Sequence, residues 1–319
     1  LDFADIAEKI DAKHAAVYKK NTAKKIFPLE IGGFYKFSLA SEYHDYSPSV
    51  VYAMQKMVET GDKKDYEHYK ALINGRNQKM IRDFLAISSD KKAIDIKDVE
   101  SKEAIFKRFA TAAMSLGSIS PEAHEAMAEA MNRIGGMSNS GEGGESPERL
   151  KSSKNSRIKQ VASGRFGVTP AYLRSATEIQ IKLAQGAKPG DGGLLPAAKV
   201  AEHVQAIRGV PKADLNSPPN HQGLYSIEES VQKMHLSLNA AFGFRVPVAI
   251  KCAASATSVS VYNNLLRDPY KICGGFFIDG IQGGTGAANE ISLDHTGHPV
   301  VSKIRDCYLA AVKQGLQGQ

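Results

Sequence analysis

The stretch that decides the fold runs from Ala112 to Glu145 and reads AAMSLGSISPEAHEAMAEAMNRIGGMSNSGEGGE. Its first five residues, Ala112 to Leu116, form a short apolar run that is typical of a strand. Ser120-Pro121-Glu122 then supplies an N-cap residue, a proline at the first helical position and an acidic first turn. The helix that begins here is expected to end at Gly135-Gly136, before a second short strand near Ser138. The stretch therefore predicts a strand, a helix and another strand, which is the unit of a parallel sheet.

The same unit recurs toward the C-terminus. Ser226 and Glu229 form a capping box ahead of a helical pattern, and Val246 to Ile250 follows as a buried strand. The last helix is expected from Val301 to Gln314. Strands are predicted near Ala113, Ser138, Ile158, Asp214, Val248 and Phe277. Strands and helices that alternate over this length favour a TIM-type (β/α)8 flavin barrel, and about six strands in place of eight make the barrel incomplete, with an exposed edge.

The first 100 residues have a different character. We expect them to form a mainly helical connector ahead of the barrel, which would occupy residues 101–319. Apolar spacing predicts helices over Ser49 to Glu59, Asp65 to Leu72 and Met80 to Leu85. The chain begins with Leu and shows no signal segment, so we expect an internal piece of a longer protein or a processed product.

Composition excludes several classes of protein. The 319 residues include 41 Lys and Arg against 34 Asp and Glu, and the two signs are mixed along the chain, which favours a solvated surface over a nucleic-acid-binding one. No apolar run approaches the roughly 18 residues of a membrane span. Cys252, Cys273 and Cys307 are too few and too widely spaced for a disulfide framework or a Cys-x-x-Cys metal site. We therefore expect no metal site and a cytoplasmic location.

Four glycine-rich segments lie where strands are expected to end, which is where barrels place their chemistry. They span residues 113–120, 138–145, 185–193 and 283–287. Glycine allows the backbone to pass close to a bound molecule or to adopt a positive φ. None of the four is a Walker loop or the Gly-x-Gly-x-x-Gly turn of a dinucleotide-binding fold. Four such segments in one domain are more than turns alone require.

Long motifs connect these segments almost without interruption. They include residues 109–144, IKQVASGRFGVT at 158–169, QIKLAQGAKPGDGG at 180–193 and residues 217–228, with Gly32 to Lys36 and Glu42 to His44 upstream. This series resembles the FMN-binding synthase domain of the glutamate synthase large subunit. The resemblance implies a flavin barrel that converts 2-oxoglutarate and ammonia, through 2-iminoglutarate, to L-glutamate. It also implies a glutamine amidotransferase domain that sends ammonia through a tunnel, and a small subunit or ferredoxin as electron donor.

The resemblance implies roles for particular residues. Lys188 and Arg208 match positions associated with 2-oxoglutarate, and Gln185 matches a third as an amide donor. A dicarboxylate that enters a low-dielectric pocket needs fixed cations of this kind. The catalytic candidates are Lys188, Glu142 and Glu145. The two carboxylates would position the imine or relay a proton, unless they belong to a simple exposed acidic loop.

The cofactor expected from the resemblance is FMN, with Lys251 facing the part of the flavin where negative charge grows on reduction. The residues assigned to FMN are Met114, Ser115, Ser163, Lys251, Gly283, Gly284 and Thr285. The chain departs from the family at Leu194, where a Gln is usual, and in the loops after Lys251 and before Gly283. It also ends before the family's last two strands and its iron–sulfur cysteines. We therefore expect no cluster here, and the remaining part of the barrel as a partner.

Two other functions stay open. A truncated module could bind a carboxylate or a partner chain without catalysis. Another FMN barrel, such as a hydroxy-acid oxidase, would use a histidine base at a strand end. His221, which follows Pro218-Pro219-Asn220, is the histidine suitably placed for that role.

Overall fold

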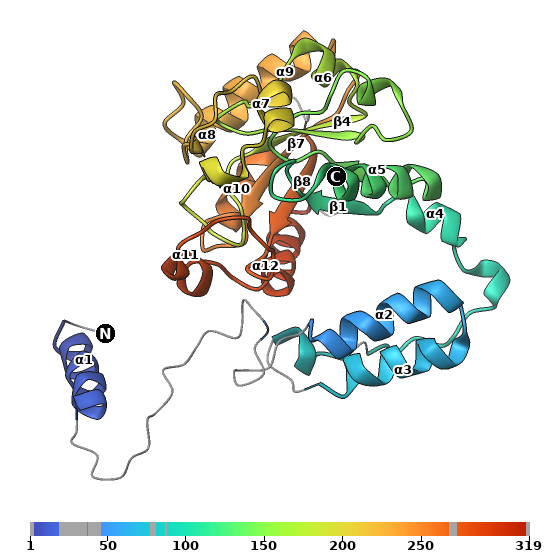
Figure 1. Ribbon diagram of the computed structural model, residues 1–319, viewed down its shortest axis with the longest axis vertical. Coiled ribbons are helices and arrows are strands. Elements are labelled where there is room, and N and C mark those ends of the chain that lie inside the picture. The colour runs from blue at the N-terminus through green and yellow to red at the C-terminus, as the bar shows by residue number, and fades with distance from the viewer. Residues whose placement is uncertain are drawn as a thin grey trace. The chain divides into compact units, whose positions relative to one another are not determined.

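The computed structural model describes residues 3–18, 37, 46–76, 81–86, 88–267 and 273–316. The chain divides into two compact units, Leu1–Ala86 and Ile87–Gln319 (Figure 1). The upstream motifs at Gly32 to Lys36 and Glu42 to His44 lie outside the described residues.

The first unit is helical where it is described. Its elements are α1 (Phe3–Tyr18), α2 (Pro48–Thr60), α3 (Lys63–Asn74) and the 3-10 helix η1 (Ile81–Phe84). Helix α2 ends at Gly61, which has a φ of 63°, and Asp62 caps α3 by accepting the N–H of Lys64 at 2.7 Å. The two helices predicted at 49–59 and 65–72 are confirmed, whereas the third, predicted from Met80 to Leu85, is a short 3-10 turn.

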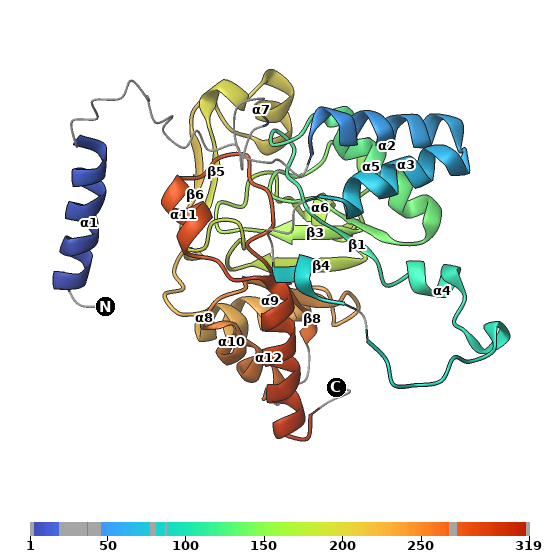
Figure 2. The ribbon, with the colours of Figure 1, turned by 90° about the horizontal axis from the view of Figure 1, so that it is seen from below.

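The second unit contains a curled sheet of six parallel strands, an incomplete TIM-type barrel, as predicted (Figure 2). In spatial order the strands are β1 (Ala110–Ala113), β2 (Met137–Asn139), β3 (Ile158–Val161), β4 (Glu178–Lys182), β7 (Val248–Ala253) and β8 (Cys273–Asp279). Among the described residues, β1 and β8 each pair on one side only. The sheet is therefore open at both edges.

One predicted strand is present but does not belong to the parallel sheet. The strand expected near Asp214 is β6 (Leu215–Ser217), which pairs antiparallel with β5 (Gly193–Leu195) in a separate ribbon. The strand that completes the six-stranded sheet is β4, which was not predicted and which pairs with β3 and β7. The ribbon forms because Leu195 and Leu215 bury themselves against Leu116 and against helix α7 (Glu202–Arg208), beside which Figure 2 shows it.

Helices cover the outer face of the sheet. The remaining elements are η2 (Ile96–Asp98), α4 (Lys102–Phe106), α5 (Pro121–Ile134), η3 (Arg149–Lys151), α6 (Pro170–Arg174), η4 (Ala197–Lys199), α8 (Ile227–Glu229), the π-helix η5 (Ser230–Met234), α9 (His235–Ala241), α10 (Ser258–Leu266), α11 (Glu290–His295) and α12 (Val300–Lys313). Figure 1 shows α10 and α12 beside β7 and β8. Ser120 caps α5 and Gly135 ends it with a φ of 84°, as predicted. None of the described helices has the length and hydropathy of a membrane span.

Strand alternation separates an apolar outer face from a polar inner one. On β4, Ile179 and Ile181 pack in the main core with Val248 and Ile250 of β7. The alternate residues point to the other face, where the Gln180 Oε1 atom accepts hydrogen bonds from Asn139 at 3.0 Å and Gln160 at 2.7 Å. A buried row of amides thus lines the inside of the sheet, below the carboxyl ends of the strands.

Candidate functional site

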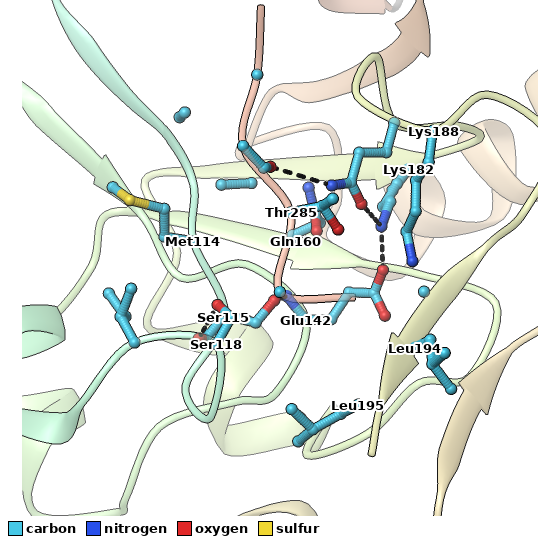
Figure 3. Close-up of a pocket in the computed structure, with 18 of the residues that line it drawn as sticks. Met114, Ser115, Ser118, Glu142, Gln160, Lys182, Lys188, Leu194, Leu195 and Thr285 are labelled. Carbon is cyan, nitrogen blue, oxygen red and sulfur yellow. Dashed lines mark hydrogen bonds and ion pairs between the residues drawn. The ribbon is translucent and has the colours of Figure 1, made fainter. Parts of the chain in front are cut away.

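A cavity of about 350 Å³ lies at the carboxyl ends of the strands, and we call it the charged cavity (Figure 3). Every strand of the sheet contributes a lining residue, either from its C-terminal half or from the loop that follows it; β2 does so through Glu142 in its loop, and β3 through Gln160. Parallel barrels concentrate binding groups at this end because all their strands terminate there. The polar and charged lining residues are Ser115, Ser118, Glu142, Gln160, Lys182, Gln185, Lys188, Arg208, Lys251, Asp279 and Thr285.

The fold brings most of the predicted site residues together in this cavity. The predicted residues that line it are Met114, Ser115, Glu142, Gln185, Lys188, Arg208, Lys251, Gly283, Gly284 and Thr285. Glu145 and Ser163 are outside this lining. The Ser163 hydroxyl donates to the carbonyl of Pro218, at the end of the β5–β6 ribbon.

Glu142 is buried at the centre of the charged cavity. Its Oε1 atom receives the Lys182 ammonium (Figure 3). Its Oε2 atom accepts the Ser217 hydroxyl at 2.9 Å. Burial opposes the charge of Glu142, but the nearby Lys182 ammonium and the two hydrogen bonds outweigh it, so the pKa of this carboxyl lies below its usual value. Glu142 is therefore an ionised hydrogen-bond acceptor at neutral pH.

Lys188 and Arg208 differ from the other two cations of the cavity. Both are buried, and among the described residues neither has a carboxylate within ion-pair distance. The Lys188 ammonium donates to the carbonyl of Ala287 at 2.6 Å, and the Arg208 guanidinium donates to the carbonyls of Leu116 and Glu142, each at 2.6 Å. Burial lowers the pKa of both side chains. These two positive charges are held by neutral acceptors alone.

Glycine at position 143 makes room for the Arg208 side chain. A Cβ at Gly143 would lie 2.7 Å from a terminal nitrogen of the guanidinium, and the residue has a φ of 149°, which L-residues rarely adopt. The glycine-rich turn is therefore needed for the approach of a cation.

Lys182, Gln160 and Asp279 were missed as site residues by the sequence reasoning. Lys182 links Glu142 to the Oε1 atom of Gln185, at 3.3 Å, and Asp279 lies 3.0 Å from the Lys251 ammonium. A signal for Lys182 was present, because the alternation in Glu178 to Lys182 places Gln180 and Lys182 on one face. No comparable pattern marks Asp279.

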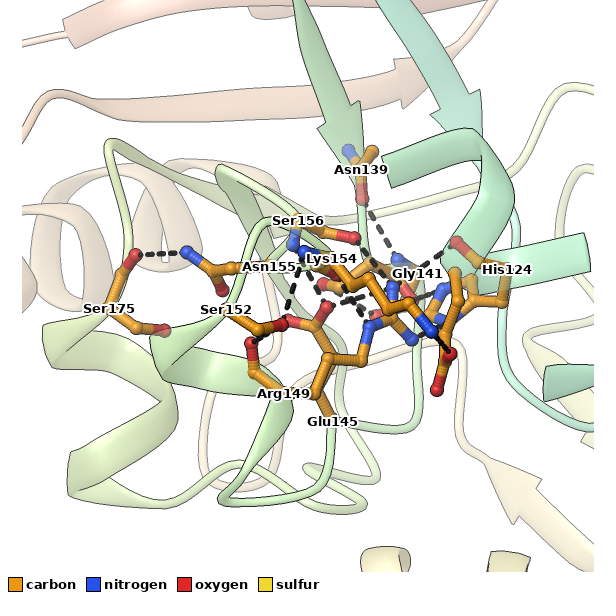
Figure 4. A network of polar contacts seen from close by, with 12 residues as sticks. His124, Asn139, Gly141, Glu145, Arg149, Ser152, Lys154, Asn155, Ser156 and Ser175 are labelled. Carbon is orange, nitrogen blue, oxygen red and sulfur yellow. Dashed lines mark hydrogen bonds and ion pairs between the residues drawn. The ribbon is translucent and has the colours of Figure 1, made fainter. Parts of the chain in front are cut away.

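Glu145 belongs to a buried ion-pair network on the other side of its loop (Figure 4). It receives the Lys159 ammonium, its Oε1 atom accepts the N–H of Ser156 at 3.0 Å, and Arg149 lies 3.1 Å away. His124 continues the network through Arg149, and burial beside this guanidinium lowers the pKa of His124 to about 4. Glu145 is therefore neither part of an exposed acidic loop nor a lining residue of the charged cavity. Its ion pair with Lys159 links its loop to β3.

His221 lines a second cavity, of about 280 Å³, which we call the uncharged cavity because no Asp, Glu, Lys or Arg lines it. The His221 Nε2 atom donates to the carbonyl of Lys182 at 2.9 Å. Burial lowers the pKa of His221. Because Lys182 lines the charged cavity, His221 lies next to a residue of that cavity but does not line it.

Comparison with known proteins gives consistent matches. A family model described as a conserved region in glutamate synthase matches residues 44–319. The glutamate synthase [NADPH] large chain of Bacillus subtilis is 38% identical over 99% of this chain and 21% of its own length. Ferredoxin-dependent glutamate synthase 1 of Arabidopsis thaliana is 37% identical over 99% of this chain and 20% of its own length. The chain thus spans about a fifth of the length of these curated relatives.

Proposed function

Because the chain belongs to the glutamate synthase family, we propose that its charged cavity binds 2-oxoglutarate during FMN-dependent reductive amination of this acid by ammonia to L-glutamate. One observation carries the proposal: Lys188 and Arg208 are buried in the same cavity, and among the described residues neither forms an ion pair with a carboxylate. Burying a cation without a counter-charge is costly unless a ligand supplies that charge.

The balance of charge in the cavity suits a dianion. Four cations, Lys182, Lys188, Arg208 and Lys251, face two carboxylates, Glu142 and Asp279. Each carboxylate neutralises one lysine, which leaves two positive charges for two carboxylates of a substrate. The amide of Gln185 donates to the carbonyl of Gly284 at 3.4 Å, which is long for a hydrogen bond, so a substrate could take over this donor.

The same cavity fits FMN at several points. No atom lies within 4 Å of a Cβ built on Gly284, so the loop after β8 presents bare backbone to open space. Met114 and Ser115, which follow β1, also line the cavity, and Lys251 contributes a positive charge. FMN, when bound, supplies the hydride that reduces the imine.

The residues of the chain would divide the remaining tasks. Lys188 and Arg208 would hold the two carboxylates of 2-oxoglutarate, and their charge-assisted hydrogen bonds would fix its orientation. The ionised Glu142 would accept an N–H of the incoming ammonia or of the imine, and would keep that nitrogen in place. Apolar side chains of Leu194 and Leu195 line the side formed by β5, and would limit the access of water.

The family implies partners beyond this chain. We infer that ammonia comes from a glutamine amidotransferase domain, that a small subunit or ferredoxin supplies electrons, and that an iron–sulfur cluster belongs to other parts of the protein. The curated names support both kinds of donor, because one relative is named for NADPH and another for ferredoxin. We infer a cytoplasmic location for this chain. The place of His221 in the uncharged cavity gives no support to a hydroxy-acid oxidase.

Calorimetric titration of 2-oxoglutarate tests the proposal, with the protein at its full natural length and loaded with FMN. Replacing Lys188 by Ala is expected to weaken binding about ten- to a hundredfold, since a charge-assisted hydrogen bond contributes about 1.5 to 3 kcal/mol. Lys199→Ala is the matched control. The Lys199 ammonium also donates to a carbonyl of the same loop, that of Gly286 at 2.7 Å, but Lys199 does not line the cavity.

The control is expected to bind 2-oxoglutarate like the wild type. Equal affinities in wild type and Lys188→Ala would remove Lys188 from the substrate site. Absence of any 2-oxoglutarate binding would instead favour the non-catalytic module.

A further inference from the structure

Two lysines of the charged cavity are direct neighbours in the sheet. Lys182 of β4 and Lys251 of β7 are register partners, so their side chains leave the same face at the same level. Like charges placed opposite one another on neighbouring strands destabilise a sheet. Each of the two lysines has its own carboxylate, Glu142 for Lys182 and Asp279 for Lys251.

Asp279 is fixed from several sides at the end of β8. Its Oδ2 atom lies 3.0 Å from the Lys251 ammonium and accepts the N–H of Gly186 at 3.0 Å. Its own carbonyl accepts the N–H of Ala254 at 2.7 Å. A Cβ at Gly186 would collide with the Asp279 backbone, so glycine is required for this approach. Asp279 thus joins β7, β8 and the loop after β4, which carries Gln185 and Lys188.

From this geometry we propose that Asp279 is a positioning residue that holds the Lys251 ammonium, neutralises its charge and thereby lowers the reduction potential of bound flavin. The inference rests on the proposed function, because it assumes that FMN binds in the charged cavity. It adds a residue to which no role had been assigned.

The direction of the effect follows from charge. Reduction adds negative charge to a flavin, and a cation nearby favours the reduced form. The Asp279 carboxylate opposes this in two ways, since it cancels the Lys251 charge and is itself negative in the same cavity. Removal of the carboxylate should therefore stabilise the reduced form and raise the midpoint potential.

Two variants separate the charge of Asp279 from its anchoring role. Asp279→Asn removes the charge and keeps an oxygen that can accept the N–H of Gly186, whereas Asp279→Ala removes both. The control is Asp306→Asn on α12, because Asp306 also lies 3.0 Å from a lysine, Lys303, but does not line the cavity.

The midpoint potential is measured by spectroelectrochemistry on the full-length protein loaded with FMN, so the readout does not depend on turnover. Asp279→Asn is expected to shift the two-electron reduction equilibrium about tenfold toward the reduced form, which corresponds to about 30 mV. Asp306→Asn should have the wild-type potential. Asp279→Ala should also bind 2-oxoglutarate more weakly, because the loop that carries Lys188 loses its anchor at Gly186.

A double variant covers the case in which single substitutions leave Lys251 buried and unpaired and the protein fails to fold. Lys251→Met with Asp279→Asn removes both charges together, which buried pairs often tolerate. Its potential is expected within about 10 mV of the wild type, a shift of about twofold in the equilibrium. Equal potentials in wild type and Asp279→Asn, or a large shift in the double variant, would overturn this inference alone. Failure of the wild type to bind FMN would overturn the inference together with the proposed function.

Discussion

At the scale of single residues, the two glutamates of one glycine-rich loop point to opposite sides and have different tasks. Glu142 faces the charged cavity, while Glu145 is enclosed with Lys159 and Arg149. A buried carboxylate that neutralises buried cations cannot be removed without leaving them unpaired. Glu145 therefore contributes to stability, and through stability to the position of Glu142.

Replacement of Glu145 by Gln is expected to lower the free energy of unfolding by about 3 to 5 kcal/mol, because Lys159 and Arg149 lose their counter-charge. Chemical denaturation measures the change. Glu125→Gln is the control, since Glu125 and its partner Lys154 lie at the surface, with 33% and 46% of their side chains exposed, and their pair should contribute little. Similar losses in the two variants would mean that the buried network does not stabilise the protein.

At the scale of elements, the loop after β2 leaves room for Arg208 of α7 because Gly143 has no side chain. Gly143→Ala would push the guanidinium away from the carbonyls of Leu116 and Glu142, so we expect 2-oxoglutarate to bind at least tenfold more weakly. Gly135→Ala at the end of α5 is the control, because Gly135 also has a positive φ, 84°, but no atom lies within 4 Å of its Cβ.

Titration of both variants by calorimetry, with circular dichroism to confirm folding, makes the comparison. Backbone strain alone, of about 1 to 2 kcal/mol, should act on both proteins. An affinity reduced to the same extent in both variants would attribute the effect to strain rather than to Arg208.

The elements that the sequence predicts well are those whose ends carry local signals. Helix α5 has a capping serine, a proline and a terminal glycine, and the structure begins and ends it at those residues. Strand β4 was missed because the three residues on one face are Glu178, Gln180 and Lys182, so only two of its five residues are apolar. The strand expected near Asp214 exists as β6 but was assigned to the wrong sheet, because a short strand pattern does not reveal whether its partner is parallel or antiparallel.

The same limit applies to the candidate site. The positions of Lys188 and Arg208 were expected from long motifs, and both line the cavity as neighbours of Glu142. The burial of Glu145 and the pairing of Asp279 with Lys251 depend on strands that are far apart in the sequence. Spacing along the chain carries no information on such contacts, and only the packed sheet creates them.

At the scale of the whole molecule, the open edge of the second unit has consequences for association. Strand β8 is half-buried along nearly all its length, and among the described residues it pairs only with β7. Beside it, α12 exposes a stripe of apolar side chains, namely Val301, Ile304, Tyr308, Leu309 and Val312. An unpaired edge strand next to an exposed apolar stripe is a surface on which proteins associate.

We therefore expect this chain, expressed alone, to form dimers or larger species that light scattering after gel filtration would detect. Ile304→Lys and Tyr308→Lys together place two charges on the stripe, where the side chains are 54% and 60% exposed, and should raise the monomer fraction at a given concentration. Val58→Lys is the control, because Val58 is 72% exposed but belongs to α2 in the other unit. A wild-type chain that elutes as a compact monomer at micromolar concentration would contradict the prediction. An equal effect of the control substitution would also contradict it, because association would then arise from the first unit rather than from the open side of the barrel.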